Sequence, residues 1–230
     1  MSEPTTLAIK TEGLVRRYGK HTAVAGLDLS IAPGTIFGFI GPNGAGKTTT
    51  LRMLAGLLEP SDGAVYLSGY PLHRNLAAAQ HLVGYMPDFF GVYDDLRVWE
   101  YLDFFARCHN IPSAKRRSTV DSLLDLVDLA DKRTSFVQGL SRGMQQRLCL
   151  AHALVHDPPI LLLDEPASGL DPQARVELRE LIRTLSDMGK TIVLSSHILN
   201  ELEDICTEVG IMARGTLLAS GPIDELRRQR

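Results

Sequence analysis

Few folds accommodate the segment at residues 41–48. It reads GPNGAGKT and matches the pattern G-x-x-x-x-G-K-[ST] at every fixed position. A short apolar strand is predicted just before it, at 36–40, and a helix just after it, from Lys47. Glycines let an anion approach the backbone closely, and the N–H groups at a helix start attract negative charge. A glycine-rich turn could match by chance, but the strand–loop–helix context predicts a phosphate-binding loop.

The residues of this loop have distinct expected roles. Lys47 supplies a point charge for the β- and γ-phosphates of a nucleotide, and the hydroxyl of Thr48 can ligate Mg²⁺. The residues predicted to bind the nucleotide are Gly41, Pro42, Asn43, Gly44, Ala45, Gly46, Lys47, Thr48 and Thr49.

Two acidic residues follow the apolar strand predicted at 160–163. A buried parallel strand carries its last residues to the carboxyl edge of the sheet, where ligands of open α/β folds bind. Asp164 is placed to hold Mg²⁺ through a water, and Glu165 to polarise the water that attacks the γ-phosphate. Acidic residues also end many strands simply because they are solvated there. The prediction therefore depends on the phosphate-binding loop.

Two further side chains are candidates with a structural alternative. His197 follows the strand predicted at 191–194, and its place at a strand end lets it reach the γ-phosphate. A histidine in such a place is also often structural. Tyr18 offers an aromatic face on which adenine could stack, although a half-buried turn tyrosine explains it equally well.

Composition limits the other functions open to the chain. The 230 residues carry a net charge of −3 and are 44% hydrophobic, which excludes disorder and the basic footprint of a nucleic-acid-binding protein. The three cysteines form no metal-type or redox pair, so a reduced, cytosolic thiol set is expected. Residues 1–10 lack the apolar core of a signal peptide, and no apolar run approaches a membrane span.

The order of predicted elements indicates an α/β fold with a mostly parallel sheet covered on both faces. Helices are expected at 119–127, 143–155, 173–185, 199–206 and 223–228, and further strands at 27–31, 64–67, 209–212 and 216–219. A helix at 98–108 begins a segment, about residues 90–142, that is predicted to be an all-helical insert. We expect one domain over residues 1–230, with this insert as a subdomain.

Together these segments resemble the ATP-binding cassette (ABC) ATPases, the nucleotide-binding domains of ABC transporters. The likeness extends over nearly the whole chain and follows the family's order. Residues 41–48 correspond to the Walker A loop, residues 160–165 to Walker B, and residues 168–171 to the D-loop, with Asp171 at its end. Tyr18 stands at the position of the adenine-stacking aromatic, and His197 at that of the switch histidine.

The signature segment distinguishes this family from other phosphate-loop proteins. Here it consists of Ser141, Arg142, Gly143 and Met144. The resemblance implies a P-loop ATPase with a small antiparallel β subdomain, ATP as substrate and Mg²⁺ as cofactor. It also implies that two such domains, as a homodimer or with a close relative, pair head-to-tail, so that each signature segment covers the partner's ATP. An integral membrane subunit would be driven by the reopening of this dimer, which places the chain in the cytoplasm, at the inner face of the cell membrane.

Two positions depart from the family pattern. The signature is commonly LSGGQ, and this chain has Arg142 and Met144 in place of a glycine and the glutamine. Asp88 follows Tyr85-Met86-Pro87 where the family's Q-loop normally supplies a glutamine. A carboxylate can still ligate Mg²⁺, so Asp88 is a third candidate metal ligand, but it adds negative charge beside the γ-phosphate. Both departures resemble the branch that serves exporters with a separate membrane subunit.

The helical insert is where family members contact their membrane subunit. Phe89, Phe90 and Tyr93 precede its first helix and are interface candidates, although aromatic residues here could equally form the insert's own core. The basic run at 115–117 could approach lipid headgroups or be a solvated helix face. Two alternatives to an export ATPase stay open: an ABC ATPase acting on ribosomes or DNA, and a regulatory switch that binds ATP with little turnover.

Overall fold

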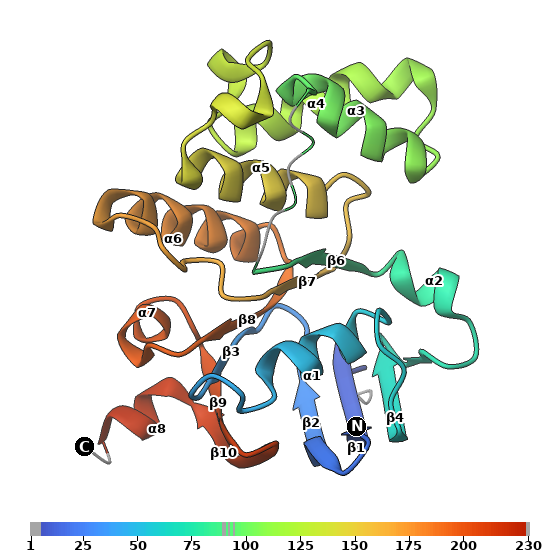
Figure 1. The fold of residues 1–230 in the computed structure, drawn as a ribbon, viewed down its shortest axis with the longest axis vertical. Helices are drawn as coiled ribbons and strands as arrows, with labels where there is room; N and C mark the ends of the chain where they lie inside the picture. Colours follow the sequence, from blue (N-terminus) through green and yellow to red (C-terminus); the bar gives the residue numbers. More distant parts are fainter. Residues whose placement is uncertain (1–5, 89–90, 92, 94, 229–230) are drawn as a thin grey trace, which may run out of the picture.

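Two separate sheets organise the chain (Figure 1). The structure, a computed structural model, describes residues 6–88, 91, 93 and 95–228. A four-stranded antiparallel sheet has the order β2-β1-β4-β5 and consists of β1 (Ile9–Tyr18), β2 (His21–Ile31), β4 (Asp62–Leu67) and β5 (Tyr70–Pro71). A six-stranded sheet has the order β10-β9-β3-β8-β7-β6 and consists of β3 (Ile36–Ile40), β6 (Val83–Met86), β7 (Ile160–Leu163), β8 (Thr191–Ser196), β9 (Glu208–Ala213) and β10 (Thr216–Pro222).

The larger sheet is parallel from β9 through to β6, and only the β9–β10 pair is antiparallel. The helices that connect its strands or extend from them are α1 (Lys47–Leu54), α2 (Leu76–Gln80), α3 (Val98–Cys108), α4 (Ser113–Leu126), α5 (Arg142–Ala153), α6 (Pro172–Asp187), α7 (Leu199–Glu203) and α8 (Ile223–Arg228). Two short 3₁₀ helices, η1 (Ala130–Lys132) and η2 (Val137–Gly139), lie between α4 and α5.

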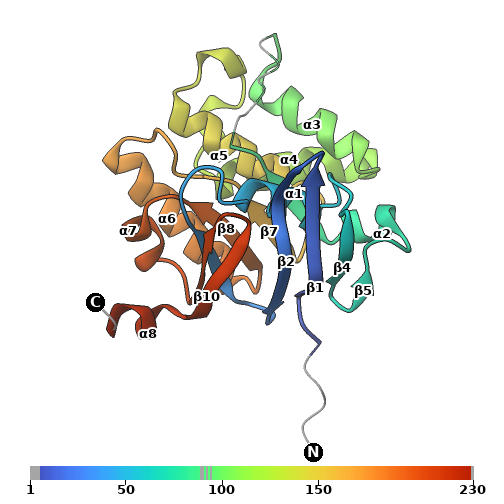
Figure 2. The same cartoon turned by 60° about the horizontal axis from the view of Figure 1, so that its bottom comes forward.

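Both faces of the larger sheet are buried, and its strands separate two hydrophobic clusters. On β7, Leu161 and Leu163 enter one cluster, and Ile160 and Leu162 enter the other. The first cluster is completed by α3 to α7, whereas the second contains α1 and the inner face of the antiparallel sheet. Figure 2 shows these two layers on opposite sides of β7 and β8. Because alternate residues of one strand serve different clusters, the strand must be apolar throughout, as its sequence is.

The structure confirms the α/β fold and several predicted bounds. The elements predicted at 36–40, 98–108, 160–163 and 223–228 begin and end at those residues. Three strands were not predicted. In β1, register shifts between Thr11 and Leu14 and again toward Arg17 break the alternation of apolar and polar residues. The other two, β5 and β6, lie at the edges of their sheets and have only two and four residues, too few for a clear pattern.

The helical segment differs from the prediction in one boundary. The fourth helix begins at Ser113 rather than at 119, because its first turns are polar and exposed and therefore carry no apolar period. At the start of α3, the backbone N–H of Arg97 donates to Glu100 Oε2 at 2.8 Å, which caps the helix. Within the part of the chain that the structure describes, no helix is long and apolar enough to cross a membrane. That the chain forms one domain, with the helical insert at about residues 90–142 as its subdomain, stays a prediction.

Candidate functional site

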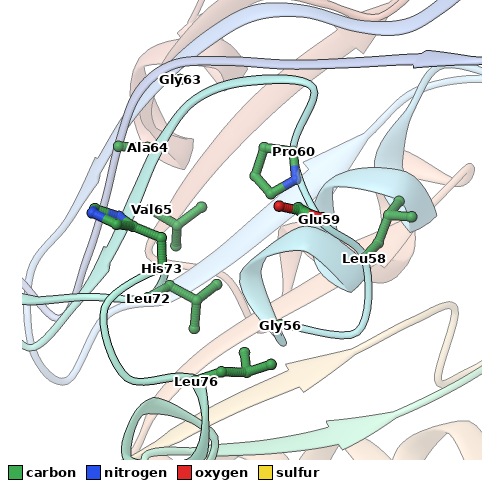
Figure 3. Close-up of a pocket in the computed structure, with 10 residues that line it drawn as sticks. All are labelled: Gly56, Leu58, Glu59, Pro60, Gly63, Ala64, Val65, Leu72, His73 and Leu76. Carbon is green, nitrogen blue, oxygen red and sulfur yellow. The ribbon is translucent and has the colours of Figure 1, made fainter.

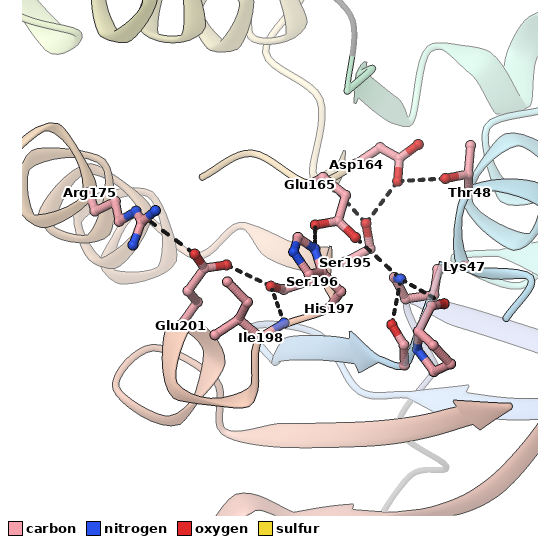
Figure 4. A network of polar contacts seen from close by, with 12 residues as sticks. Lys47, Thr48, Asp164, Glu165, Arg175, Ser195, Ser196, His197, Ile198 and Glu201 are labelled. Carbon is pink, nitrogen blue, oxygen red and sulfur yellow. Dashed lines mark hydrogen bonds and ion pairs between the residues drawn. The ribbon is translucent and has the colours of Figure 1, made fainter. Parts of the chain in front are cut away.

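Three strand ends meet at the carboxyl edge of the larger sheet. Strand β8 lies between β3 and β7, and the register pairs Ile40 with Ser196 and Leu163 with Leu194. The chain continues from β3 into the loop at 41–46, from β7 into Asp164, and from β8 into His197. Segments far apart in the sequence are thereby brought together where ligands of parallel sheets bind (Figure 4).

The loop at 41–46 wraps the start of α1. Its last residue, Gly46, is the N-cap with φ +105°, and no side chain caps the first turn, so the turn's N–H groups are available to an anion. That these glycines admit a phosphate stays a prediction. A Cβ at Gly41 would lie 2.2 Å from the carbonyl oxygen of Met212, and one at Gly46 would lie 2.6 Å from that of Ala23. These two glycines are needed for packing on β9 and β2, while Gly44 faces open space.

Lys47 directs its ammonium group back into this loop. The side chain is buried, and Nζ donates to the carbonyl oxygens of Gly41 at 2.7 Å and Pro42 at 3.4 Å. The same atom lies 3.2 Å from Oε1 of Glu165. The predicted loop lysine and the predicted base are therefore an ion pair.

Asp164 is the most deeply buried acid of the site, at 1% exposure. Its Oδ1 accepts hydrogen bonds from Thr48 Oγ1 at 3.0 Å and from Ser195 Oγ at 2.8 Å. Its Oδ2 is buried and has no hydrogen-bond partner among the described residues. Burial raises the pKa of Asp164, with smaller contributions from the charges of Asp88 and Glu165, and the two hydroxyl groups oppose this rise.

This donor set fits a hard divalent cation. An unpaired, buried carboxylate oxygen beside a hydroxyl is the chemistry that Mg²⁺ prefers, and it also explains why an otherwise costly orphan oxygen is present. No group of three or more acidic, histidine or cysteine side chains in the described ranges could hold a metal by itself. A cation held here would therefore rely on Thr48 and Asp164 together with oxygens of a bound nucleotide.

Glu165 is held from two sides. His197 Nδ1 donates to Glu165 Oε2 at 2.9 Å, opposite the ion pair with Lys47. The backbone of Glu165 has φ +47°, which is uncommon for a residue with a Cβ. Its N–H donates to Ser195 Oγ at 2.9 Å. The carboxylate is thus directed toward the phosphate-binding loop.

A second polar chain supports the segment that carries His197. Ser196 Oγ donates to Glu201 Oε2 at 2.6 Å and accepts from the N–H of Ile198 at 3.0 Å. Glu201 Oε1 lies 3.8 Å from Arg175 Nε on α6 (Figure 4). Neither Ser195 nor Ser196 was predicted to take part in the site. The signal that could have drawn attention to them is the change from apolar residues to two hydroxyls at a strand end.

The signature segment and the D-loop lie against each other. Ser141 is the N-cap of α5, and its Oγ accepts from the N–H of Met144 at 3.3 Å. A Cβ at Gly169 would lie 2.4 Å from Cζ of Arg142, so the guanidinium covers the backbone of the D-loop. Asp171 is the N-cap of α6 and accepts from the N–H of Ala174 at 2.9 Å. Arg142 therefore packs against the D-loop of its own chain.

Tyr18 and Asp88 take no part in these hydrogen bonds and ion pairs. Tyr18 ends β1 with 47% of its surface exposed, and the guanidinium of Arg16 lies 4.7 Å from its ring centroid. Asp88 is exposed and follows β6. Among the described residues, no hydrogen bond or ion pair joins Tyr18 or the signature segment to Lys47, Asp164 or Glu165. Phe89 and Phe90 lie outside the described residues, whereas Tyr93 is exposed.

A pocket of about 440 Å³ lies apart from this cluster, between the end of α1, β4 and α2 (Figure 3). Its walls are mostly apolar, with one carboxylate and one imidazole: Gly56, Leu58, Glu59, Pro60, Gly63, Ala64, Val65, Leu72, His73 and Leu76. None of the predicted site residues lines it.

Comparisons with known proteins agree with this arrangement. The sequence profile described as ABC transporter matches residues 24–168. The chain is 41% identical over 222 residues to Nod factor export ATP-binding protein I of Ralstonia nicotianae, covering 96% of this chain and 69% of that protein. It is 37% identical over 222 residues to daunorubicin resistance ATP-binding protein DrrA3 of Streptomyces coeruleorubidus, covering 96% and 70%.

Solved structures are similar over almost the full chain. One, an ATP-binding subunit of an ABC transporter, has a TM-score of 0.85 at 31% identity and covers 97% of this chain and 93% of its own. Another, cbiO1 from Clostridium perfringens, part of the ABC transporter complex cbiONQ, has a TM-score of 0.87 at 25% identity, with 97% and 92% covered. The chain belongs to the ABC transporter family, as an ATP-binding subunit with ATPase activity.

Proposed function

We propose that this subunit binds Mg²⁺-ATP at the carboxyl edge of the larger sheet. The loop at 41–49 holds the phosphates, with Lys47 on the β- and γ-phosphates, and Tyr18 stacks on adenine. Thr48 and Asp164 hold Mg²⁺, assisted by Asp88, and the ion supplies charge neutralisation of the phosphates. The buried, unpaired Oδ2 of Asp164 supports this assignment.

Glu165 is the proposed general base. It accepts a proton from the attacking water, whose oxygen bonds to the γ-phosphorus while the bond to the ADP oxygen breaks. His197 keeps the carboxylate directed at that water and senses the γ-phosphate. The observation that carries the proposal is the pair of contacts on Glu165, from Lys47 at 3.2 Å and from His197 at 2.9 Å.

Hydrolysis is completed in a head-to-tail pair of ATPase subunits, formed by two copies or by this chain and a close relative. In this pair the signature residues Ser141, Arg142, Gly143 and Met144 cover the partner's ATP, since the start of α5 offers an anion site. Asp171 holds the D-loop at the same junction through its cap on α6. Loss of the γ-phosphate reopens the pair.

The opening powers export through an integral membrane subunit, to which this chain binds at the cytoplasmic face of the membrane. The names of two relatives, a Nod factor export protein and a daunorubicin resistance protein, support export as the direction. Purification from native membranes with this chain as bait should recover an integral membrane subunit. Recovery of ribosomes or DNA-bound complexes in its place would favour the alternative class of ABC ATPase.

The catalytic part is tested with Glu165→Gln, which keeps the side-chain shape and removes the base. We expect ATP binding at wild-type affinity, phosphate release reduced at least 100-fold, and a dimer that persists in ATP. Glu180→Gln is the control, because Glu180 forms an exposed pair with Arg183 on α6. Hydrolysis by Glu165→Gln at the wild-type rate would contradict the base, and a monomer in saturating ATP would contradict the paired site.

A regulatory switch with little turnover is the second candidate. The charge of Asp88 contributes to raising the pKa of Asp164, which works against the ionised form that a cation needs. Phosphate release that stays at background while ATP still binds to the wild-type chain would favour this switch.

A further inference from the structure

Ser195 occupies the centre of the site without having been predicted there. It belongs to β8, the strand between the one that leads into the phosphate-binding loop and the one that leads into the acid pair. It pairs with Phe39 on β3 and, one residue beyond the pairing of Leu194 with Leu163, lies beside Asp164. Its side chain is completely buried. A buried hydroxyl must find partners, and both partners of this one are in the site.

The single hydroxyl group of Ser195 is used twice. Its hydrogen is donated to Asp164 Oδ1 at 2.8 Å, and its oxygen accepts the backbone N–H of Glu165 at 2.9 Å (Figure 4). The proposed metal ligand and the proposed base therefore both bond to the Ser195 hydroxyl group, although their proposed chemical roles differ.

The first bond helps to determine which oxygen of the Asp164 carboxylate is left for a cation. Thr48 and Ser195 both donate to Oδ1, which leaves Oδ2 unpaired. Without Ser195 the carboxylate has one hydrogen bond and can rotate about its terminal torsion, which is broad. A cation ligand that is held by fewer partners binds its cation less well.

The second bond holds the turn after β7. Glu165 has φ +47°, and its carbonyl oxygen accepts from the N–H of Ser168 at 3.0 Å. A left-handed residue with a Cβ persists only where its neighbours hold it. The N–H···Oγ bond to Ser195 is one of these restraints, and it acts at the backbone of the residue whose carboxylate faces Lys47 and His197.

We infer that Ser195 is a positioning residue of the ATPase, which orients Asp164 toward the metal and Glu165 toward the attacking water through one hydroxyl group. The inference rests on the roles proposed above for these two acids. It adds that their orientation depends on the neighbouring strand β8 and not on β7 alone.

The test removes the hydroxyl with Ser195→Ala and restores it with Ser195→Thr. A cavity of about 30 Å³, lined in part by Ser195 and Ala167, leaves space near the added methyl group. Thr191→Val is the matched control: Thr191 is equally buried, lies at the other end of the same strand, and accepts a hydrogen bond from the N–H of Gly34 at 3.0 Å. Thermal unfolding of each variant confirms that it folds.

Two readouts are measured, and one does not need turnover. A non-hydrolysable ATP analogue is titrated in EDTA and again in Mg²⁺. In Ser195→Ala we expect unchanged affinity in EDTA, an enhancement by Mg²⁺ that falls about 10-fold, and a kcat about 10–100-fold lower at little changed KM. Ser195→Thr should recover both readouts to within about 3-fold, and Thr191→Val should match the wild type in both.

The inference would be overturned if Ser195→Ala had the Mg²⁺ enhancement and the kcat of the wild type. It would also be overturned if Ser195→Ala lost as much analogue affinity in EDTA as in Mg²⁺, or if Thr191→Val lost as much as Ser195→Ala, because either result would indicate a structural role. Because the enhancement is measured without hydrolysis, it is independent of the Glu165 base. Hydrolysis by Glu165→Gln would therefore refute the proposed base. The role of Ser195 in orienting Asp164 would still be tested by the Mg²⁺ enhancement of analogue binding.

Discussion

The imidazole of His197 donates a hydrogen bond to the carboxylate of Glu165 across 2.9 Å, while the histidine itself keeps 43% of its side chain exposed. The two residues follow neighbouring strands, His197 after β8 and Glu165 after β7. The bond leaves Glu165 between an imidazole and the ammonium of Lys47, so the carboxylate has two opposed partners that fix its direction.

Replacement of His197 should therefore slow the chemistry more than binding. In His197→Ala we expect kcat about 100-fold lower and ATP affinity within about 2-fold of the wild type, because Lys47 and the loop are untouched. Steady-state phosphate release and equilibrium ATP binding give the two numbers. His73→Ala, which changes a histidine of the separate pocket in Figure 3, is the control. A kcat equal to that of the control would show that the bond has no catalytic role.

Asp88 can be tested by two replacements that differ in oxygen content. Asp88→Gln keeps an oxygen ligand without the charge, whereas Asp88→Ala removes both. We expect Asp88→Ala to lower the ATPase rate about 10-fold at limiting Mg²⁺ and Asp88→Gln to retain most of it. The assay is phosphate release over a Mg²⁺ titration. Equal rates in all three proteins would remove any role of Asp88.

The contact between Arg142 and Gly169 predicts a coupled pair. Gly169 has φ +67°, and a methyl group there would collide with the guanidinium. Gly169→Ala should lower the free energy of unfolding by about 1–2 kcal/mol and reduce the ATPase rate, because the guanidinium of Arg142 is displaced from the D-loop. In Gly169→Ala/Arg142→Ala the collision is absent, so part of both losses should return. Urea denaturation and phosphate release of the four proteins complete the cycle; strictly additive effects would show that the residues are not coupled.

Buried histidines predict a loss of stability in mild acid. Burial is the main cause that lowers the pKa of His152 and of His156 to about 4 from 6.5, and nearby His109 lowers both further. His109 stacks on His156 with ring centroids 4.0 Å apart, and Lys190 adds a further positive charge against His156. As the pH falls, these histidines bind protons in the unfolded chain at a higher pH than in the folded chain. The stability that they contribute above pH 6.5 is therefore lost as the pH falls toward 4.

Between pH 7 and pH 5 we expect the free energy of unfolding to fall by about 2–4 kcal/mol from this pair. Urea denaturation at several pH values measures the slope, and His152→Gln should reduce it. His21→Gln provides the comparison, since His21 is exposed. A slope that His152→Gln leaves unchanged would assign the acid sensitivity to other groups.

Local signals made much of the site predictable. The loop at 41–48 carries its own turn, helix start and charge, so neighbouring residues suffice to identify it. Asp164 and Glu165 could be placed because a buried strand ends just before them. These features depend on segments of about ten residues, over which period and composition are informative.

The remainder depends on which segments become neighbours. The bond from Ser195 to Asp164 spans 31 positions and exists only because β8 pairs with β7. The packing of Arg142 on Gly169 likewise requires α5 and α6 to start side by side, which no local pattern encodes. Strand order and helix packing decide such contacts, and a single sequence carries little direct record of either.

The place of β8 has a consequence for biosynthesis. This strand joins β3 to β7, yet its residues are translated after both of them. A nascent chain that stops before residue 191 thus has its lysine loop and its acid pair on strands with no partner between them. Cellular ATP can stabilise by mass action only a chain whose last central strand has been inserted. Truncated translation products therefore receive no such protection and are left to proteolysis.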